Sequence, residues 1–491
     1  MKKLISFKNP LDFLFKTAKT APKAAALITA KQNYTYETLR DAVLRQAGRL
    51  RSHGVVQGKR VAIYSDDDSF VIITIFATWA LGAICIPVNI MQPKEKIVYL
   101  GSVIKPNFAL GDSAELFEEE IDFFKIPSTG ESVPINEVYS PDADDTAIVM
   151  FTSGTSGVPK PVPMTYRSIG HNCWETAIRL SITAADRILI NSPPYYTSSI
   201  IHNLTLYSQG GSVVINRSLL FGDTIINLLE EYHCTGFGGV PVHFARIAGY
   251  FEETIQVKNL RFLMNSGEHL PIPILLKIQK MLPDVQFFCV YGLTEVAGRL
   301  CILDPEMIKK KAGSVGIPLK GMNVTIRDEN GKILPPNEQG EVYITGLTLM
   351  KGYLNNPEVN SKSMCTYGFA TGDFGSLDED GYLYLEGRAD DIIKVGGEKV
   401  SLKMIEEAIY GFPAFSDYIV APKFDRLMGY VPYVHYVHNK KIKFKKKELL
   451  KKIKAILPSN HIPAFFVETD EIPLSDSGKK LRKALYPPRE E

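Results

Sequence analysis

Short apolar segments alternate with helix-length segments over most of this 491-residue chain. Segments 61–64, 83–86 and 147–150 are short and rich in aliphatic residues, whereas 68–81 has the length and pattern of a helix. Apolar strands separated by helices are typical of parallel sheets with helices on both faces. We therefore expect an α/β fold built on parallel-rich sheets. Further strands are predicted at 187–190, 212–215, 260–264 and 287–291, and a further helix at 93–103.

The pattern changes after Gly313. Strand-like segments 324–327, 340–344 and 382–385 are separated by turns rich in Gly, Asn and Asp, which predicts a small antiparallel β subdomain at about 313–388. The remaining residues, 389–491, show mixed helix and strand patterns typical of a small α+β domain. Because 491 residues exceed the size of one hydrophobic core, we predict a large N-terminal domain, 1–388, and a small C-terminal domain, 389–491.

The composition argues against several classes of protein. A net charge of +2 provides no overall attraction to nucleic acid or to an anionic membrane. The six cysteines form no CxxC pair, so we expect reduced thiols, no zinc site and a cytoplasmic location. The basic first ten residues lack the apolar run of a signal peptide, and the most apolar stretch, 70–88, contains Gly82 and Pro87. We therefore expect no membrane span.

Nine lysines lie between positions 440 and 454. The spacing of the apolar residues among them predicts a helix with a solvated lysine face and one buried stripe. That stripe would contain Phe444, Leu449, Leu450, Ile453 and Leu457. The alternative is a positively charged docking surface for a phosphorylated or acidic thiol carrier.

The most informative segment is FTSGTSGVPK at 151–160, which follows the predicted strand 147–150. Glycines allow the backbone to fold closely around an anion, hydroxyl and N–H groups donate to phosphate oxygens, and a lysine adds positive charge. The spacing GxxxxGK[ST] of a Walker A loop is absent, which argues against a P-loop kinase or ATPase. The segment therefore predicts a phosphate-binding loop of another kind.

Further motifs follow in a fixed order, and together with this loop the chain resembles the adenylate-forming superfamily from about residue 30 to its end. This superfamily includes acyl- and aryl-CoA synthetases, adenylation domains of peptide synthetases, and firefly luciferase. The motifs are WALGA at 79–83 leading to PVN at 87–89, YGLTE at 291–295, GY at 352–353 followed by PE at 357–358, TGD at 371–373, GRADDIIK at 387–394 and SGKKLR at 477–482.

The resemblance implies an ATP-dependent ligase that needs Mg²⁺. Such an enzyme converts a carboxylic acid into an acyl-adenylate, releases pyrophosphate, and passes the acyl group to a thiol. The loop would hold the β- and γ-phosphates, Thr294 the α-phosphate, and Glu295 the Mg²⁺ ion. The loop residues expected to take part are Thr152, Ser153, Gly154, Thr155, Ser156, Gly157 and Lys160.

The resemblance also implies roles further along the chain. Tyr291 offers a flat face for adenine, and Asp373, assisted by Arg388, would bind the ribose hydroxyls. Lys479 is the expected catalytic cation, because an ammonium between the attacking carboxylate and the α-phosphate stabilises the transition state. Its neighbour Lys480 is expected to be a solvated residue. These last residues would lie on a mobile domain that turns about Asp390.

The acid pocket implied by the family contains no aspartate between Asn191 and Asn203, which disfavours an amino-acid substrate. Fatty, aryl and dicarboxylic acids stay open. The pocket residues expected are Tyr195, Tyr196, Val240, Pro241, Ser266 and Gly267. Gly396 and Gly397 would line the approach of the thiol. Coenzyme A is the favoured thiol, since no carrier domain is fused to the chain, and the alternative is a separate phosphopantetheinyl carrier protein.

Two departures from the family pattern affect these expectations. Ser156 and Pro161 replace the usual threonine and glycine of the loop, and Pro161 removes an N–H and stiffens the loop end. Tyr196 stands where an aromatic-gate histidine is usual in the family, so this chain departs from the family's gating residue at this position. Two other classes remain, a binding protein of this fold without catalysis and an oxidative enzyme of the luciferase type. A homodimer is compatible with all of these hypotheses.

Overall fold

The computed structural model describes residues 7–111, 132–152, 159–218, 221–388, 391–395, 398–425, 429–458, 461–463, 465–474 and 480–485. The chain divides into two units. Unit 1 contains the described residues of 1–154, 158–323 and 345–369, and unit 2 contains those of 324–344 and 370–491. The domain limits 1–388 and 389–491 stay a prediction.

Unit 1 contains a five-stranded sheet in the order β5-β3-β4-β6-β7. Four of these strands are parallel, and β7 runs antiparallel to β6. Their bounds are β3 Arg60–Tyr64, β4 Ile84–Pro87, β5 Phe108–Gly111, β6 Thr146–Phe151 and β7 Pro161–Thr165. The strand predicted at 147–150 is therefore the central part of β6, and the phosphate-loop sequence connects β6 to β7.

Unit 1 also contains a nine-stranded sheet in the order β14-β13-β12-β11-β10-β8-β9-β1-β2. The six strands from β12 to β1 in this order are parallel, and the edge strands are antiparallel. The bounds are β1 Ala25–Thr29, β2 Asn33–Thr35, β8 Arg187–Ile190, β9 Ser212–Ile215, β10 Gly236–Gly239, β11 Phe262–Asn265, β12 Gln286–Tyr291, β13 Cys301–Leu303 and β14 Ile317–Pro318. The predicted α/β class with parallel-rich sheets is confirmed.

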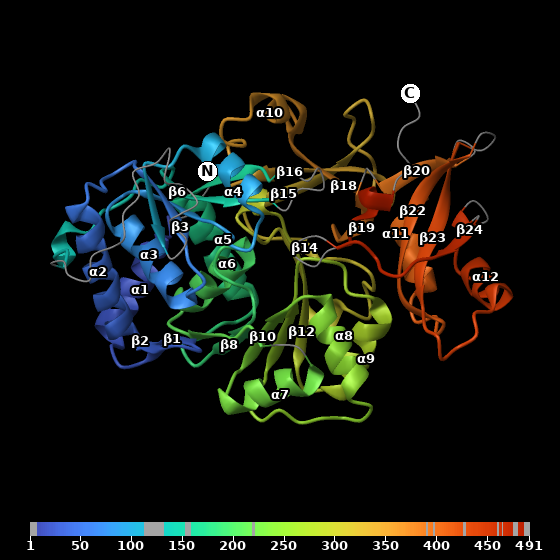
Figure 1. The fold of residues 1–491 in the computed structure, drawn as a ribbon, viewed down its shortest axis with the longest axis horizontal. Helices are drawn as coiled ribbons and strands as arrows, with labels where there is room; N and C mark the ends of the chain where they lie inside the picture. The colour runs from blue at the N-terminus through green and yellow to red at the C-terminus, as the bar shows by residue number, and fades with distance from the viewer. Residues whose placement is uncertain are drawn as a thin grey trace. The chain divides into compact units, whose positions relative to one another are not determined.

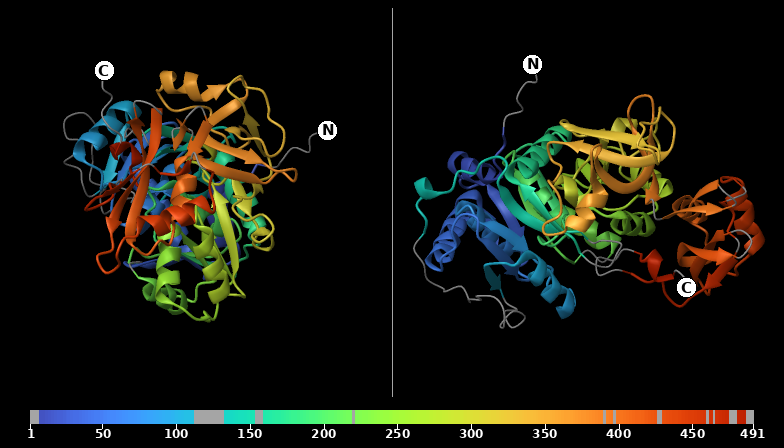
Figure 2. Two further views of the ribbon diagram at one scale, coloured as in Figure 1. Left: turned by 90° about the vertical axis from the view of Figure 1, so that its right-hand side faces the viewer. Right: turned by 90° about the horizontal axis from the view of Figure 1, so that it is seen from above.

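Helices cover the sheets of unit 1. Helices α1, α2 and α3, dark blue in Figures 1 and 2, pack against one another, and α7, α8 and α9, light green, form a second group beside β10 and β12. Between them in sequence, α5 packs on α6, which covers β8 and β9. The bounds are α1 Pro10–Thr20, α2 Tyr36–Ser52, α3 Asp68–Ala80, α4 Lys94–Ile104, α5 Tyr166–Arg179, α6 Thr197–Tyr207, α7 Gly222–Glu231, α8 Pro241–Tyr250, α9 Ile272–Met281 and α10 Pro357–Ser363.

Helix α3 anchors the strand that leads into the phosphate loop. The helix begins after Asp67, whose side chain accepts a hydrogen bond from the Phe70 N–H at 3.1 Å. At its other end the fully buried Trp79 donates its indole N–H to the carbonyl of Ala147 in β6, at 2.8 Å. The tryptophan of the WALGA motif therefore fixes β6 at Ala147, five residues before Thr152.

The strands that follow β14 are mainly antiparallel. Strand β18 (Gly368–Leu377) runs between β16 (Gly340–Gly346) and β19 (Leu383–Arg388), with β15 (Met322–Arg327) beyond β16 and the short β17 (Met364–Cys365) paired to the start of β18. A second sheet has the order β21-β20-β23-β22, with β24 parallel to β23. Its strands are β20 Ile392–Val395, β21 Glu398–Ser401, β22 Phe415–Asp425, β23 Gly429–His438 and β24 Phe465–Glu468.

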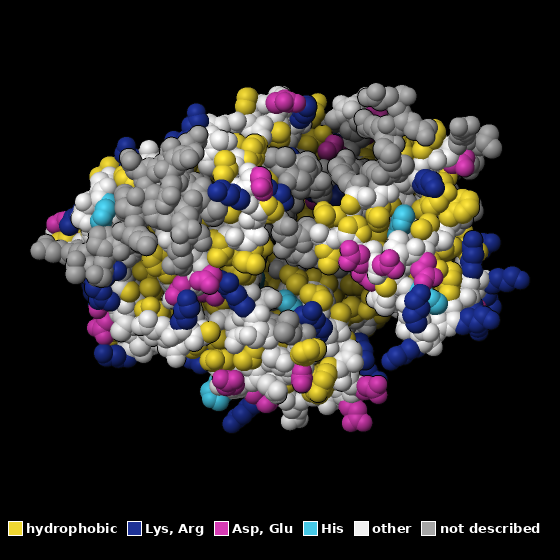
Figure 3. Space-filling view, in the orientation of Figure 1, with side chains coloured by type: hydrophobic (Ala, Val, Ile, Leu, Met, Phe, Trp, Pro, Cys, Tyr) yellow, Lys and Arg dark blue, Asp and Glu magenta, His cyan; other side chains and the backbone are white. Residues whose placement is uncertain are grey.

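Helices α11 (Leu402–Ile409) and α12 (Lys446–Lys454) share a hydrophobic core with the β22–β23 hairpin. In α12, Leu449 and Ile453 are buried, Leu457 beyond it is also buried, and Phe444 packs against the same core. Eight of the nine lysines between 440 and 454 are exposed, and dark-blue side chains stand out on this part of the surface in Figure 3. The helix with one buried stripe agrees with the prediction, although Leu450 is only half-buried.

Within the described ranges, none of the helices combines the length and apolarity needed to cross a membrane. All six cysteines lie in these ranges, and all are free thiols.

We predict that Trp79→Phe lowers the free energy of unfolding of unit 1 by about 1–3 kcal/mol, because the buried carbonyl of Ala147 loses an indole donor and the ring loses volume. Trp174→Phe is the matched control, since Trp174 is only half-buried, and it should cost less. Urea unfolding followed by circular dichroism measures both variants. Equal losses for the two substitutions would contradict the anchoring role of Trp79.

Candidate active site

The parallel strands of the large sheet end at one edge. In the register of the sheet, Ile190 lies beside Gly238, and Gly239 beside Asn265, which in turn pairs with Cys289. In open α/β sheets, ligands bind outside the carboxyl ends of such strands. The residues that follow these ends are Asn191, Val240, Ser266 and Gly292, so the predicted pocket segments meet at this edge.

The base of the phosphate loop is closed by two hydrogen bonds. The Thr152 N–H donates to the Lys160 carbonyl at 3.1 Å, and the Lys160 N–H donates to the Thr152 hydroxyl at 3.3 Å. Pro161 is the first residue of β7 and lies opposite Phe151. A missing N–H is tolerated at the first residue of a strand. Both ends of the loop are therefore fixed by β6 and β7. The loop residues Ser153, Gly154, Thr155, Ser156 and Gly157 lie outside the described residues.

The YGLTE segment turns sharply at the end of β12. A Cβ atom at Gly292 would lie 1.8 Å from the carbonyl oxygen of Gly298, so only glycine fits this close approach. A short 3-10 helix, Thr294–Val296, follows. The Thr294 hydroxyl lies 3.4 Å from the hydroxyl of Thr197 at the start of α6.

Glu295 is the carboxylate expected to bind Mg²⁺, and it is buried. Its Oε1 accepts a hydrogen bond from the Tyr353 hydroxyl at 2.6 Å, and its carbonyl accepts one from the Met350 N–H at 2.8 Å. The Lys160 ammonium lies 5.3 Å from the centre of the Tyr353 ring. A hard oxygen ligand beside a phosphate-loop lysine fits Mg²⁺, which usually takes one or two carboxylates and completes its shell with phosphates and water.

The acid-pocket residues fall into two groups. Val240 and Pro241 begin α8 directly after β10, and the Ser266 N–H donates to the Gly239 carbonyl at 3.0 Å, which places Ser266 and Gly267 beside them. Tyr195 and Tyr196 are half-buried, with ring centres 5.0 Å apart. The Tyr196 hydroxyl accepts from the Asn89 amide at 3.3 Å, so Asn89 of the PVN motif supports the tyrosine that replaces the usual histidine.

Two buried histidines lie beside these groups. His243 accepts a hydrogen bond from the Val240 N–H at 3.2 Å on Nδ1, and its Nε2 lies 2.9 Å from the Asn191 amide nitrogen. Burial, helped by the charge of Arg246, lowers the pKa of His243 to about 4. Burial and the positive charge of Arg299 lower the pKa of His202 to about 3. Both imidazoles are therefore neutral at pH 7.

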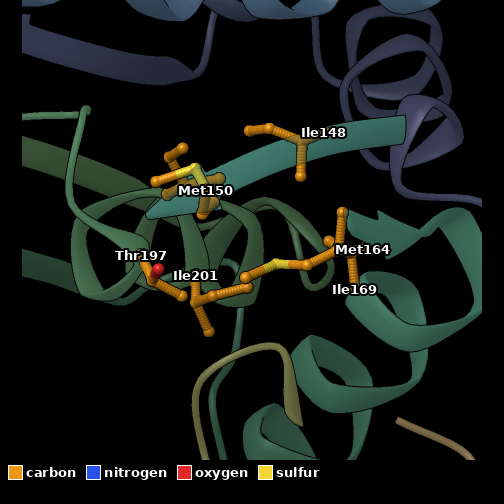
Figure 4. Close-up of a pocket in the computed structure, with 7 residues that line it drawn as sticks. Ile148, Met150, Met164, Ile169, Thr197 and Ile201 are labelled. Carbon is orange, nitrogen blue, oxygen red and sulfur yellow. The ribbon is translucent and has the colours of Figure 1, made fainter. Parts of the chain in front are cut away.

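A small apolar hollow lies between the end of β6 and helix α6, and Thr197 lines it (Figure 4). Ile148 and Met150 of β6 face Met164 and Ile201 across it, and Thr197 contributes the labelled oxygen in this view. Its lining separates the strand leading into the phosphate loop from helix α6. Thr197 lines this hollow, and its hydroxyl lies 3.4 Å from the hydroxyl of Thr294.

In unit 2, Asp373 and Arg388 face each other across β18 and β19. The Arg388 guanidinium donates to the Asp373 carboxylate and to the Thr371 carbonyl, each at 3.1 Å, and the Asp373 N–H donates to the Thr371 hydroxyl at 3.0 Å. Asp373 is thus a buried strand residue with a fixed carboxylate rather than part of an exposed turn. That geometry suits an acceptor for paired hydroxyls, which is the predicted role.

Four predicted residues of the C-terminal region, Asp390, Gly396, Gly397 and Lys479, lie outside the described residues. The neighbouring Lys480 is described, and its ammonium contacts the Asp417 carboxylate and the Tyr418 carbonyl. This contact is consistent with a structural role for Lys480.

Several residues near the site, among them Asn89, Tyr353 and His243, were not among the predicted ones. Asn89 and Tyr353 lie inside motifs that carry the family resemblance. The sequence therefore showed the motifs, but it did not indicate that Asn89 contacts Tyr196 or that Tyr353 contacts Glu295. No sequence signal identified His243, because a single histidine in an apolar helix is most often an ordinary core residue.

We predict that acidification destabilises unit 1. The unfolded chain binds protons on His202 and His243 below about pH 6.5, whereas the folded protein excludes them until about pH 3 and 4. The free energy of unfolding should therefore fall between pH 6.5 and 4, by about 2 kcal/mol per histidine from pH 7 to pH 5. Urea unfolding followed by the fluorescence of Trp79 and Trp174 measures this loss. In His243→Asn, about half of this loss of unfolding free energy should disappear. An unchanged pH dependence would contradict the conclusion that His243 is held neutral in the folded protein.

Comparisons with known proteins agree with this geometry. The family profile described as "AMP-binding enzyme" matches residues 14–354. The 2-succinylbenzoate–CoA ligase of Bacillus subtilis is 29% identical over 482 residues, covering 96% of this chain and 97% of that protein. A feruloyl-CoA synthase of Amycolatopsis sp is 28% identical and covers 95% and 96%.

A solved structure of o-succinylbenzoate CoA synthetase from Bacillus subtilis, in complex with the acyl-adenylate intermediate OSB-AMP, has a TM-score of 0.89 at 27% identity and covers 98% of both chains. The same enzyme in complex with ATP and a magnesium ion has a TM-score of 0.88 at 27% identity and covers 96% of this chain and 99% of that one. Since the family profile matches well over half of the chain, the protein belongs to the AMP-binding enzyme family.

Proposed function

We propose that this protein is an AMP-forming acid:CoA ligase whose substrate is an aromatic carboxylic acid, with 2-succinylbenzoate as the first candidate and ferulate as the second. The observation that carries this proposal is that one tyrosine contacts both a cation and a carboxylate. The Lys160 ammonium lies over the Tyr353 ring, and the Tyr353 hydroxyl donates a hydrogen bond to the Glu295 carboxylate. A lysine for phosphates and a carboxylate for Mg²⁺ are what adenylation requires.

The named relatives support the same activity. CoA ligases and synthetases match nearly the whole chain, which confirms the prediction of an AMP-forming acid:CoA ligase and favours coenzyme A over a carrier protein as the thiol. The o-succinylbenzoate CoA synthetase of Bacillus subtilis has been solved in complex with ATP and a magnesium ion. ATP and Mg²⁺ are also the cofactors that the sequence of this protein predicts.

In the first step, an oxygen of the acid carboxylate attacks the α-phosphorus of ATP, and the bond to the bridging oxygen breaks to release pyrophosphate. Thr152 and Lys160 would bind the phosphates that leave, and Thr294 the α-phosphate. Bound Mg²⁺ would supply positive charge to the phosphate oxygens. Lys479 would lie between the two anions as they approach each other, and Asp373 with Arg388 would hold the ribose.

In the second step, the sulfur of coenzyme A attacks the acyl carbonyl, the bond to the AMP oxygen breaks, and the thiol proton passes to solvent. Gly396 and Gly397 would leave room for the slender pantetheine arm. Because the two steps need different residues at the same adenylate, the proposal includes a C-terminal domain that turns about Asp390.

The acid pocket favours an aromatic body near the carboxylate. Tyr195 and Tyr196 provide two rings, and the neighbouring His243 is neutral at pH 7. The free thiols of all six cysteines support a cytoplasmic enzyme. A homodimer is the assembly to test by sedimentation.

Turnover should require Mg²⁺ and yield AMP and pyrophosphate, since the site binds the β- and γ-phosphates as a leaving group. ATP–pyrophosphate exchange with 2-succinylbenzoate, ferulate, benzoate, malonate and decanoate measures the substrate choice, and the two aromatic candidates should exchange fastest. Formation of ADP and phosphate would refute the ligase. Fastest exchange with decanoate or malonate would refute only the aromatic substrate.

Lys479→Ala should slow adenylation by about 10²–10³-fold, as loss of a preorganised electrostatic partner commonly does. The same variant should form thioester from synthetic acyl-adenylate and coenzyme A at close to the wild-type rate. Lys480→Ala is the matched control, because the Lys480 ammonium already contacts Asp417, and it should leave both single-turnover rates unchanged.

Asp390→Pro should show the opposite pattern, because a fixed φ hinders the turn to the second conformation. If Lys479→Ala and Asp390→Pro slowed both steps equally, the hypothesis that the C-terminal domain turns about Asp390 would be wrong for this protein, even if the ligase assignment were right.

A further inference from the structure

We infer that Tyr353 is a positioning residue for the adenylation step, holding the Glu295 carboxylate and the Lys160 ammonium in fixed places before the nucleotide binds. This inference rests on the proposed function, because it takes Glu295 to bind Mg²⁺ and Lys160 to bind phosphate. It adds a role for a residue that would not itself contact the reacting atoms.

The hydroxyl contact sets the direction of the carboxylate. Tyr353 is 5% exposed and Glu295 is 9% exposed, and the donor and acceptor oxygens are 2.6 Å apart. A hydrogen bond to an ionised acceptor is short and strong, and burial strengthens it further. A glutamate side chain has three rotatable bonds, so holding Oε1 also limits where Oε2 can point. The carboxylate is then preorganised for a metal ion.

The ring contact holds the lysine without neutralising it. The Lys160 ammonium lies 5.3 Å from the ring centre, within the range of a cation–π interaction. A carboxylate partner would compete with the phosphates for this cation, whereas an aromatic face leaves its full charge available. One side chain therefore contacts both the cation and the carboxylate of the site.

The backbone around Tyr353 is itself held by several hydrogen bonds. The Tyr353 N–H donates to the Asn360 side chain at 2.7 Å, and the Asn360 amide donates to the Tyr353 carbonyl at 2.8 Å. Gly352 has a φ of +136° and approaches Asn360 closely. Phe369 packs edge-on against the ring, with centres 6.3 Å apart. These contacts fix the tyrosine from both sides.

The residues on either side of Tyr353 bind the same two segments of the site. The Met350 N–H donates to the Glu295 carbonyl at 2.8 Å, and the Leu354 N–H donates to the Pro161 carbonyl at 3.0 Å. Segment 350–354 thus joins the turn that carries Glu295 to the strand that follows Lys160. A tyrosine that only filled space would not need to lie at the centre of this connection.

Binding of ATP without any acid tests the inference, because no turnover takes place. In Tyr353→Phe the ring stays and the hydroxyl is lost. Calorimetric titrations of ATP at a series of Mg²⁺ concentrations, and in EDTA, should show that the Mg²⁺ concentration for half-maximal ATP affinity rises roughly ten- to hundredfold, as expected for loss of a hydrogen bond to a charged group. ATP affinity in EDTA should change less than about twofold.

The matched control is Tyr343→Phe, which removes a tyrosine hydroxyl that donates to another glutamate, Glu341, at 3.0 Å. It should leave the Mg²⁺ dependence unchanged. Tyr353→Leu, which also removes the ring, should in addition weaken ATP binding in EDTA, because Lys160 loses its aromatic partner. Thermal unfolding of each variant shows that the fold is kept.

The inference is wrong if Tyr353→Phe keeps the wild-type Mg²⁺ dependence, or if Tyr343→Phe shifts it equally. This outcome is distinct from failure of the proposed function. Suppose that the protein forms no AMP with any acid, but that its Mg²⁺-dependent ATP binding still changes in Tyr353→Phe. The ligase assignment would then be wrong, and the positioning role of Tyr353 would still hold.

Discussion

The parallel pairing of β8, β10, β11 and β12 is the constraint on which the candidate site depends. Parallel strands need a crossover between them, so each carboxyl end is followed by a turn at the same edge of the sheet. Asn191, Val240, Ser266 and Gly292 stand at these turns. Asn191 and Val240, which are 49 positions apart in sequence, follow neighbouring strands for this reason. The pocket segments are therefore a consequence of the sheet order.

The five-stranded sheet of unit 1 positions the phosphate loop in a different way. Strand β6 is held from one side by Trp79 and from the other by β7, and the loop leaves from the end of this pair. Hydrogen bonds between Thr152 and Lys160 close its base. A glycine-rich segment has a high entropy in the unfolded chain, so fixing both of its ends lowers the cost of ordering it around an anion.

The charged groups of the site are held by neutral partners. Lys160 lies over an aromatic ring, Glu295 accepts from a phenol, and the nearby His243 is neutral because of its burial. Neutral partners leave the charges of Lys160 and Glu295 available for phosphate and metal. In unit 2 the arrangement is different, since Arg388 pairs directly with Asp373. There the cation helps to orient an acceptor whose expected ligands are uncharged hydroxyls.

The sequence by itself determined the α/β class, ten of the strands and the chemical types of the site residues, because hydrophobic periodicity and short motifs are local properties of the chain. The helix predicted at 68–81 is α3, Asp68–Ala80, and the strand predicted at 187–190 is β8, Arg187–Ile190. The motifs also marked Gly352–Tyr353 and Asn89 without indicating what they contact.

Only the tertiary structure decided those contacts. Tyr353 and Glu295 are 58 residues apart, and Asn89 and Tyr196 are 107 apart. No local pattern specifies such a pair, because it forms only when independently folded segments are packed together. The neutrality of His202 and His243 was equally hidden, since a pKa depends on burial and on charges brought near by the fold rather than on neighbours in the sequence.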